Sequence, residues 1–423
     1  MVYRDNRKLL FMLMRNFVSG ILFILAGCIH TVHDTKMHMD GETLACPFIP
    51  ALSVNCGRTP TTAYDKNGRL WVSYVIGESV YVAYSDDQGK QYSEPVKVNA
   101  KPEKVYTNGE NRPKVAFGRN GEILVSWTQE VTGGPFFGDI RFSRSTDGGK
   151  TFEPVRTVND DGLVTSHRFE TLFVNTAGDI FMAWLDKRDM VAAQTAGREY
   201  CGAALYYTWS KDNGVTFAKN IKVADYSCEC CRIALSETQY GDVAAFWRHI
   251  YNKTTRDHGF AELATDGVVT PAQRATVDNW QIDACPHHGP TMVTASDGTY
   301  HLSWFTLGEA RKGIFYGRYN PETGVIDNMH AVAAAGAGHS YLARTGNKLY
   351  LVWKFFDGEK TTIKLSISVD EGASWQPETI VAETTDASDH PLLISYKDNV
   401  SLSWHTSKEG LRIIPLNQAG SVK

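Results

Sequence analysis

The sequence has no large excess of charge of either sign and no long apolar run after its first 28 residues. Lys and Arg number 43 against 47 Asp and Glu, which leaves a formal net charge of −4. A chain without a basic surplus lacks the electrostatic footprint of a nucleic-acid binder, so we expect no nucleic acid as a partner. Low-complexity tracts and Pro- or Ser-rich linkers are also absent, so no boundary divides the rest of the chain. These absences favour one globular domain with a substantial core.

The one strongly apolar run lies at the N-terminus. Arg15 is followed by "FVSGILFILAG", which ends at Cys28. This run is too short to span a bilayer comfortably and has the length of a signal-peptide core. Leu25-Ala26-Gly27-Cys28 resembles the lipobox of bacterial lipoproteins, in which the cysteine is lipidated and becomes the new N-terminus.

The lipobox resemblance implies a domain plan and a location. We expect a signal peptide over residues 1–28, a lipid anchor on Cys28, a tether over residues 29–44 and a single domain over residues 45–423. The lipid would hold the domain on a membrane of the bacterial cell envelope, on either its periplasmic or its outer face. An uncleaved anchor, or a secretory signal with an incidental cysteine, is the alternative.

One octet occurs four times in the chain, with the pattern Ser-x-Asp-x-Gly-x-x-aromatic. The copies are Ser85–Tyr92, Ser145–Phe152, Ser210–Phe217 and Ser368–Trp375. This pattern resembles the Asp-box of the sialidase-like (BNR-repeat) β-propellers. Asp and Gly favour a tight turn, and the aromatic residue fixes the hairpin to its sheet. We therefore expect Asp87, Asp147, Asp212 and Asp370 to be structural and to carry no chemistry.

A second repeat predicts the number of blades. Strands that end in an aromatic residue recur every 49 to 63 residues, closing at Tyr74, Trp127, Trp184, Trp247, Trp304, Trp353 and Trp404. This spacing is the size of a four-stranded blade with its loops. We predict an all-β, seven-bladed propeller whose ring is closed by an N-terminal strand at residues 43–54, which would complete the short last blade and protect the sheet edges. A six-bladed sialidase propeller is the alternative.

The repeat register places the unusual side chains in equivalent loops. Pro60, Pro113 and Pro290 each lie fourteen residues before the aromatic residue of their blade. The loops at this position enter the innermost strands, and together they form what we call the channel mouth. Counting back in every blade brings a set of His and Cys residues to this mouth: His167, Cys228, Cys230, Cys231, Cys285, His287, His288, His339 and His390.

Two interpretations of these residues compete. Disulfides are expected in an oxidising envelope, for example between Cys46 and Cys56, or between Cys285 and one of the cysteines at 228–231. Seven cysteines remain after lipidation of Cys28, however, so they cannot all pair within one monomer. Thiolates and imidazoles together suit copper or zinc, and loops from several blades can converge on one ion. A redox or nucleophilic cysteine is a third possibility.

The resemblance to sialidases also implies an arginine cluster. The segment "GRTP" is similar to the family's entry into its first blade and makes Arg58 a candidate carboxylate-binding arginine, with Arg112, Arg168, Arg232 or Arg248 completing the cluster. Glu110 or Glu170 is the candidate partner of a tyrosine nucleophile, but no tyrosine stands in an equivalent position. The sequence thus predicts a lipoprotein propeller that binds copper or zinc for metal handling or metal-dependent chemistry. An exo-acting sialidase-like glycosidase, or a non-catalytic glycan- or protein-binding module, stays open.

Overall fold

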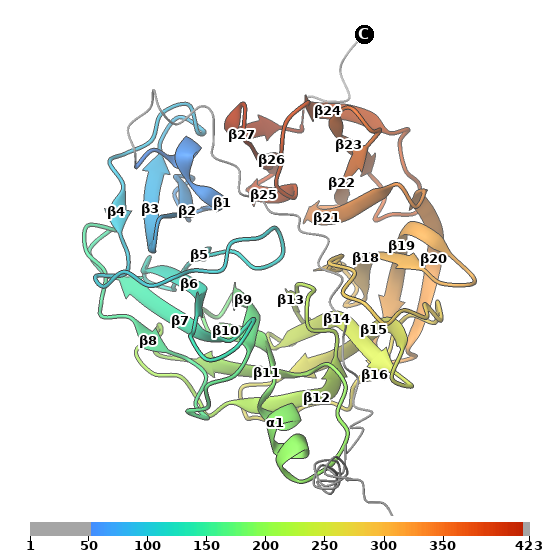
Figure 1. Cartoon of the computed structure of the whole chain (residues 1–423). Coiled ribbons are helices and arrows are strands. Elements are labelled where there is room, and N and C mark those ends of the chain that lie inside the picture. The colour runs from blue at the N-terminus through green and yellow to red at the C-terminus, as the bar shows by residue number, and fades with distance from the viewer. Residues whose placement is uncertain (1–51, 418–423) are drawn as a thin grey trace, which may run out of the picture.

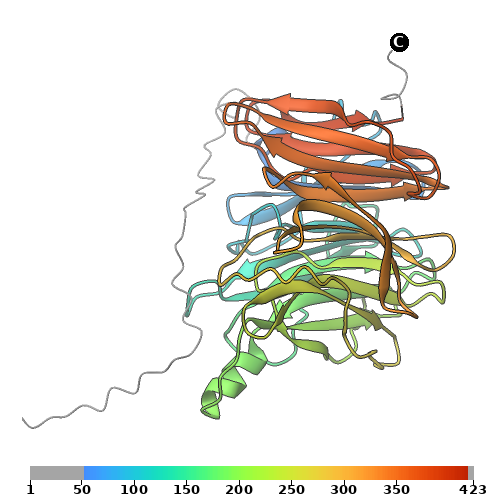
Figure 2. The same ribbon diagram turned by 90° about the vertical axis from the view of Figure 1, so that its right-hand side faces the viewer.

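The computed structural model describes residues 52–417 of the chain, and these form the predicted all-β propeller. Antiparallel sheets surround one axis, and the chain passes around the ring so that its first and last sheets are neighbours (Figure 1). Seen from the side, the strands of successive sheets lie one above another (Figure 2). No helix in this part of the chain is long and apolar enough to cross a bilayer. The predicted signal peptide, Cys28 and the tether lie outside the described residues.

The first two sheets have four strands each, and the strand earliest in sequence lies nearest the axis (Figure 1). The first sheet contains β1 (Arg58–Tyr64), β2 (Leu70–Ile76), β3 (Ser79–Ser85) and β4 (Val96–Lys97). The second contains β5 (Lys114–Phe117), β6 (Ile123–Glu130), β7 (Gly138–Ser145) and β8 (Arg156–Thr157).

The largest sheet is made of two such units. One contains β9 (His167–Val174), β10 (Ile180–Asp186), β11 (Ala203–Ser210) and β12 (Ile221–Ser227). The other contains β13 (Ala234–Glu237), β14 (Val243–Tyr251), β15 (Thr255–Leu263) and β16 (Gln273–Arg274). Only one residue pair, Ser227 with His249, joins the two units, so we treat them as separate blades.

The remaining three sheets complete the ring. The first contains β17 (Thr291–Thr294), β18 (Tyr300–Leu307), β19 (Lys312–Asn320) and β20 (Val325–Ala333). The next contains β21 (Ala337–Thr345), β22 (Lys348–Phe356), β23 (Thr361–Ser368) and β24 (Thr379–Thr384). The last has three described strands, β25 (Leu392–Tyr396), β26 (Asn399–Thr406) and β27 (Gly410–Pro415). We interpret the units as blades 1 to 7 in chain order, keeping the count that the repeats predict.

The aromatic residue that ends each repeated strand packs at the centre of its blade. Tyr74 and the six tryptophans of the repeat are among the largest buried side chains, and each lies on the second strand of a blade. A buried indole needs a hydrogen-bond partner, and Trp304 Nε1 donates to Asp278 at 2.9 Å. The apolar clusters join neighbouring blades, as where Phe142 of blade 2 packs with Trp184 of blade 3. The ring is therefore held by blade-to-blade packing of these strands.

The four octets form the same hydrogen-bonded turn. In the second copy Gly149 N donates to Ser145 Oγ at 2.9 Å, and Thr151 N donates to Asp147 Oδ1 at 3.0 Å. The equivalent bonds recur around Asp87, Asp212 and Asp370. These aspartates accept backbone N–H groups at exposed hairpin ends, which is the structural role expected of them.

Only the end of the segment expected to close the ring, from residue 52, belongs to the described part of the chain. Residues 43–51 lie outside the described part, and Val54–Cys56 form a short 3-10 helix (η2) instead of continuing a strand. Leu411 N donates to Asn55 Oδ1 at 3.1 Å, so a side chain takes the place of a strand ladder beside β27. Tyr74 O–H donates to Leu52 O at 2.7 Å, which ties the same segment to blade 1. Cys56 is disulfide-bonded, and its expected partner Cys46 is outside the described residues.

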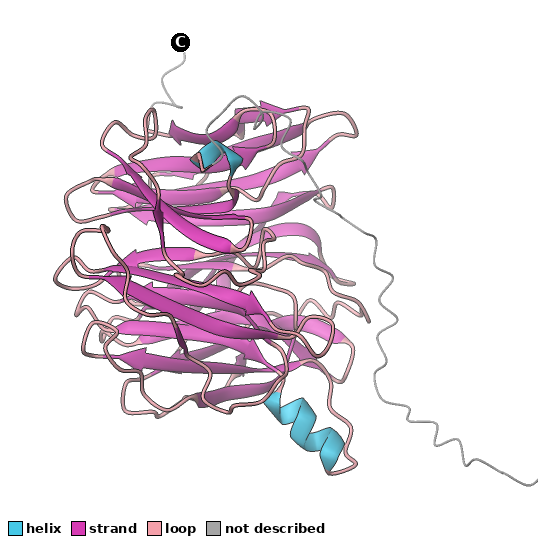
Figure 3. Cartoon of the chain, turned by 60° about the vertical axis from the view of Figure 1, so that its left-hand side comes forward, coloured by secondary structure: helices cyan, strands magenta, loops and turns pink. Residues whose placement is uncertain are grey.

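Antiparallel topology fixes which loops share a face. The loops that enter the innermost strands and those between the second and third strands lie at the same end of the ring. The helix α1 (Arg188–Thr195) belongs to this face because it connects β10 to β11, and it projects from the body of strands (Figure 3). Every loop of the channel mouth therefore faces the same side of the molecule.

His167 joins blades 2 and 3 instead of reaching the cysteines. Its Nδ1 contacts Gly138 O at 2.8 Å, and its Nε2 contacts Asp161 at 3.1 Å. Asp139 and Asp186 lie at 3.5 and 3.7 Å from the ring nitrogens. Burial opposes the charged form, but the aspartates outweigh it and raise the pKa of His167 to about 10. His167, Asp161 and Asp186 each place one possible ligand atom within 4.8 Å of the others, so His167 belongs to a carboxylate group that is separate from the thiols.

We predict a pH-dependent loss of stability in His167→Gln. Because the pKa of His167 is higher in the folded state, its protonation stabilises the fold. This stabilisation is complete below the unfolded pKa of 6.5 and is lost as the pH rises through about 10. The substitution should therefore lower the free energy of unfolding by at least about 2 kcal/mol near pH 6 and by progressively less toward pH 10. Urea unfolding of both proteins across this range measures the difference.

His330→Gln is the matched control, because His330 lies half-buried on the outer strand β20 and has no carboxylate within ion-pair distance among the described residues. Its effect should be small and nearly constant with pH. A His167→Gln penalty of the same size at every pH would show that the imidazolium carries no charge-dependent stability.

Candidate functional site at the channel mouth

Loops of five blades supply the polar side chains of the channel mouth. Glu110 precedes β5, and the segment 228–232 connects β12 to β13. The segment 285–290 connects β16 to β17, His339 lies on β21, and His390 precedes β25. Residues far apart in sequence therefore meet because each occupies the same place in its own blade.

Three cysteine thiols form a compact buried group. Cys228, Cys230 and Cys231 are each at most 3% exposed, and their Sγ atoms all lie within 4.8 Å of one another. The Sγ–Sγ distances are 3.7 Å between Cys228 and Cys230 and 3.8 Å between Cys230 and Cys231. None of the three is in a disulfide. A metal–sulfur bond of about 2.3 Å places neighbouring sulfur ligands roughly 3.8 to 4.0 Å apart, so these spacings match those of a shared ion.

The cysteine group favours one thiolate even without an ion. Hydrogen bonds from Cys230 and Cys231 hold the pKa of Cys228 well below its usual range, against the effect of burial. Burial raises the pKa of Cys230 and of Cys231 well above the usual range. The arrangement is therefore one thiolate that accepts from two thiols, and a metal ion would replace the two shared protons.

Two buried guanidinium groups supply positive charge beside the thiols. Arg248 and Arg256 are 1% and 2% exposed, and both lower the pKa of Cys228. Neither forms a salt bridge with a carboxylate in the described part of the chain, and the Nε of each has no hydrogen-bond partner there. Asp257, the neighbour of Arg256, pairs instead with Arg274. Buried cations require anionic partners, and the thiolates are the available anions.

Cys285 and His287 lie on the solvent side of the mouth. Cys285 is exposed and contributes to the raised pKa of Cys230, so its thiol is next to the buried group. His287 is exposed and has a left-handed backbone with φ of 52°. The structure therefore brings Cys285 to the edge of the thiol group and leaves His287 outside it.

The remaining histidines form a second group on the other blades. His288 stacks on Phe305 and His339, with ring centroids 4.0 and 4.5 Å apart, and His339 stacks on His390 at 3.5 Å. Burial lowers the pKa of His288 to about 2 and that of His339 to about 3, so both rings are neutral at neutral pH. The predicted single ring of His and Cys is thus divided into a thiol group and a histidine group.

Glu110 lies at the centre of the histidine group and accepts from two neighbouring loops. Its Oε2 accepts from Arg232 N at 2.9 Å and from Gly289 N at 3.2 Å. Its Oε1 lies 3.6 Å from His339 Nδ1 and 3.4 Å from His390 Nδ1. Burial opposes ionisation, but Arg232 and the two histidines outweigh it and hold the pKa of Glu110 well below its usual range.

Two glycines make this close packing possible. A Cβ at Gly109 would lie 2.3 Å from the His390 ring, and a Cβ at Gly289 would lie 2.3 Å from Glu110 Oε2. Both distances are far below van der Waals contact. The "NGE" and "HHGP" segments therefore need glycine at these positions so that the backbone can approach the buried carboxylate and ring.

The candidate arginines do not converge on one open site. Arg112 forms a buried ion pair with Asp389, and Arg232 contacts Glu110 at 3.3 Å. Arg58 is exposed and donates to Gly77 O at 2.8 Å. Only Arg168 has neither a carboxylate nor a carbonyl partner among the described residues; it donates to Ser166 Oγ at 3.1 Å and stacks near Phe136 and Tyr106.

The other carboxylate considered as a tyrosine partner is also engaged elsewhere. Glu170 contacts Lys114 at 3.0 Å and accepts from Thr128 Oγ1 at 2.6 Å. No tyrosine hydroxyl takes part in this contact network in the part of the chain that the structure describes. The tyrosine–glutamate pair of a sialidase is therefore not assembled around Glu170.

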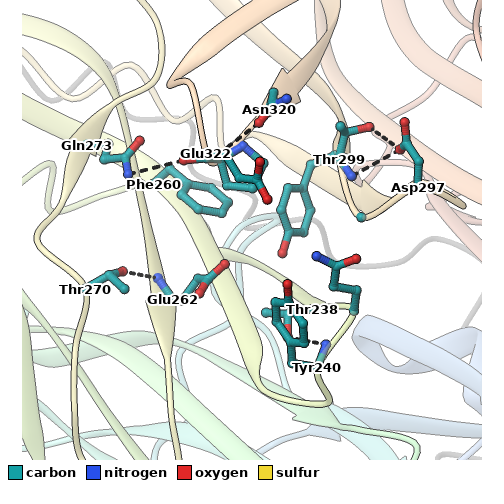
Figure 4. Close-up of a pocket in the computed structure, with 14 residues that line it drawn as sticks. Thr238, Tyr240, Phe260, Glu262, Thr270, Gln273, Asp297, Thr299, Asn320 and Glu322 are labelled. Atoms are coloured by element: carbon teal, nitrogen blue, oxygen red, sulfur yellow. Dashed lines mark hydrogen bonds between the residues drawn. The ribbon is translucent and has the colours of Figure 1, made fainter.

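The pocket shown in Figure 4 lies away from the channel mouth. It has a volume of about 380 Å³ and is lined by turns of blades 4 and 5, including Tyr240, Phe260 and Asp297. Its β13–β14 and β17–β18 turns join first to second strands, so they lie on the face opposite the mouth. This pocket brings together none of the residues that the sequence singled out.

Comparison with known proteins supports the fold and goes no further. No family model and no curated protein match the chain. Among solved structures, an ulvan lyase bound to a sulfated glucuronic acid–rhamnose repeat shares 14% identity over 84% of this chain and 93% of its own, with a TM-score of 0.53. A second polysaccharide lyase shares 10% identity over 85% and 90%, with a TM-score of 0.51.

A sialidase is also among the similar structures. The NanB sialidase from Streptococcus pneumoniae shares 12% identity over 78% of this chain and 68% of its own, with a TM-score of 0.45. The two lyases, which align more closely, show that this chain has a propeller fold found in glycan-active enzymes.

Proposed function

We propose that the channel mouth binds a soft transition-metal ion through Cys228, Cys230 and Cys231. The convergence of three buried thiols from one loop carries this proposal, because a "CECC" segment in an ordinary loop would separate its side chains. Thiolates select Cu(I) and Zn(II) over harder ions. The protein would then be a metal-handling propeller of the bacterial cell envelope, held by the lipid anchor that the N-terminal sequence predicts.

Charge favours Cu(I) over Zn(II). Three thiolates around Cu(I) carry a net charge of about −2, whereas the same ligands around Zn(II) carry about −1. Arg248 and Arg256 lie next to Cys228, and a third buried cation, Arg168, interacts with Cys230 and Cys285. The more negative Cu(I) complex is the better match for this excess of buried positive charge.

The exposed Cys285 fits a role in metal exchange. It adjoins Cys230 from the solvent side, so its sulfur atom is placed to take an incoming ion before the buried thiols do. In an oxidising compartment, neighbouring thiols without a metal would form disulfides, and ligation would protect them. A site that both binds and exchanges its ion fits metal handling better than a purely structural role for the ion.

We predict that Cys230→Ser/Cys231→Ser lowers the copper content of the purified chain at least tenfold. Serine keeps the side-chain size but replaces a soft thiolate with a poor ligand for Cu(I). Elemental analysis of the full chain, produced without affinity-tag histidines, measures the bound copper and zinc. A double variant with the metal content of the wild type would contradict the thiol site.

Ile233→Val is the matched packing control. Ile233 is buried in the same apolar cluster as the three cysteines, two residues after Cys231, and offers no ligand atom. The substitution costs about 1 kcal/mol of stability, as other Ile-to-Val core changes do, and should leave the metal content unchanged. Loss of metal in this control would mean that packing damage alone empties the site.

Binding and cleavage of an acidic glycan is the second candidate function. The lyases of similar fold act on polysaccharides, and one of them is bound to a repeat that contains a uronic acid and a sulfate. At the mouth of this chain, the Arg168 guanidinium lies 4.8 Å from the Phe136 ring, and Phe136 is 46% exposed. A guanidinium beside an exposed aromatic ring suits an anionic sugar, because the arginine pairs with carboxylate or sulfate and the ring packs on the sugar face.

The glycan candidate predicts that the full chain releases new reducing ends, or ultraviolet-absorbing unsaturated ends, from a sulfated uronate polysaccharide. Arg168→Ala should lower that rate at least tenfold, because a bidentate charge-assisted contact is lost. Arg119→Ala, in the β5–β6 turn on the opposite face, should leave the rate unchanged. The candidate fails if no product forms, or if both variants behave alike.

A further inference from the structure

The histidine group is not used by the thiol site and has the features of a separate one. Three of its rings come from different blades, and the Nδ1 atoms of His288, His339 and His390 are all buried without a hydrogen-bond partner. Glu110 lies next to two of these atoms but too far away for a well-formed hydrogen bond with His339. Buried polar atoms are normally satisfied, so three neighbouring orphans indicate a missing partner.

We propose that Glu110, His339 and His390 form a second metal site, which binds a borderline divalent ion, Zn(II) or Cu(II). Two imidazole nitrogens and one carboxylate oxygen are the donors these ions prefer, whereas Cu(I) prefers the sulfur ligands of the thiol group. The proposal does not rest on the thiol site, because the two groups share no ligand atom.

The spacing of the ligand atoms fits one ion. Zn–N and Zn–O bonds of about 2.0 to 2.2 Å in a tetrahedron place neighbouring ligand atoms roughly 3.3 to 3.6 Å apart. Glu110 Oε1 lies 3.4 Å from His390 Nδ1 and 3.6 Å from His339 Nδ1, and one donor atom from each of the three residues lies within 4.8 Å of the others. An ion between them would satisfy both nitrogens once the His339 and His390 rings, now stacked with centroids 3.5 Å apart, splay to aim both Nδ1 lone pairs at it.

The surroundings hold the donors in a binding-competent state. Backbone N–H groups of Arg232 and Gly289 fix Oε2 of the Glu110 carboxylate, and Oε1, beside the rings, also accepts from Arg232 Nη1 at 3.3 Å. Such outer contacts orient metal ligands and keep a carboxylate ionised. His288 stacks on the far side of His339 and limits its rotation.

The two metal sites would be coupled through one loop. Glu110 accepts from the N–H of Arg232, which directly follows Cys231. On the other side, Arg248 donates to His288 O at 3.0 Å and accepts from Cys228 N at 2.9 Å. These contacts therefore link the thiol site to the site of Glu110, His339 and His390. Each of the two sites would bind its own ion.

The test counts metal equivalents in the reduced full chain and its variants, using Zn(II) as the probe. Wild type should bind about two equivalents, His339→Gln/His390→Gln about one, and Cys228→Ser/Cys230→Ser/Cys231→Ser about one. In the triple-serine variant, Cu(II) should show nitrogen splitting in its electron paramagnetic resonance spectrum, and adding His339→Gln/His390→Gln should remove it and weaken binding more than about 100-fold.

His330→Gln is the matched control and should keep about two equivalents, because its ring lies on an outer strand away from the mouth. The proposal is overturned if His339→Gln/His390→Gln binds as much zinc as wild type, whatever the cysteine variants do. Loss of metal only in the cysteine variants would keep the thiol site and reject this one. If the triple-serine variant does not fold, the histidine variant in the wild-type background still decides between these outcomes.

Discussion

The ionised, buried side chain of Glu110 organises the channel mouth. It comes from the loop that enters blade 2, accepts from backbone N–H groups in the loops that enter blades 4 and 5, and contacts histidines of blades 6 and 7. A buried carboxylate costs several kcal/mol unless its lone pairs are satisfied, so these loops are held where they can satisfy it. The positions of Cys231 and His288 follow, because each directly precedes a residue that donates to Glu110. Closure of the propeller brings the loops to one face, and this carboxylate sets their spacing.

The mouth separates soft donors from borderline ones. Sulfur atoms gather on the blade 4 side, where Arg248 and Arg256 supply charge without carboxylate partners in the described residues. Imidazole and carboxylate gather on the side of blades 6 and 7, where the rings are neutral and stacked. A site that mixed all of these ligands would need one ion with sulfur, nitrogen and oxygen donors at once. Two proposed sites would let each ion take the donors that its chemistry prefers.

Sequence periodicity was sufficient to predict the fold, because every blade has a buried aromatic residue at the same place in its second strand. The register also placed His339 and His390 at the mouth, because it depends only on counting back from Trp353 and Trp404. The register could not show whether the His and Cys side chains form one ring or two separate groups. The direction of a side chain within a loop does not follow from the repeat. His167 illustrates this limit: it occupies the expected entry position but turns toward three aspartates of its own and the neighbouring blade.

Three further features had little or no signal in the sequence. Glu110 was a candidate tyrosine partner, but its contacts depend on loops more than 120 residues away. Arg256 was not among the candidate residues, yet it is buried beside the thiols. The short 3-10 helix at Val54–Cys56 was not expected either, and its Asn55 side chain accepts from Leu411 N of β27.

X-ray absorption at the copper and zinc edges, on the full chain as purified and without added metal, tests the central claim most directly. The account predicts bound metal with a shell of sulfur scatterers at about 2.3 Å, contributed by Cys228, Cys230 and Cys231. The claim is contradicted if the bound metal shows only nitrogen and oxygen neighbours at both edges. It is also contradicted if the chain carries no metal and these cysteines are joined in a disulfide.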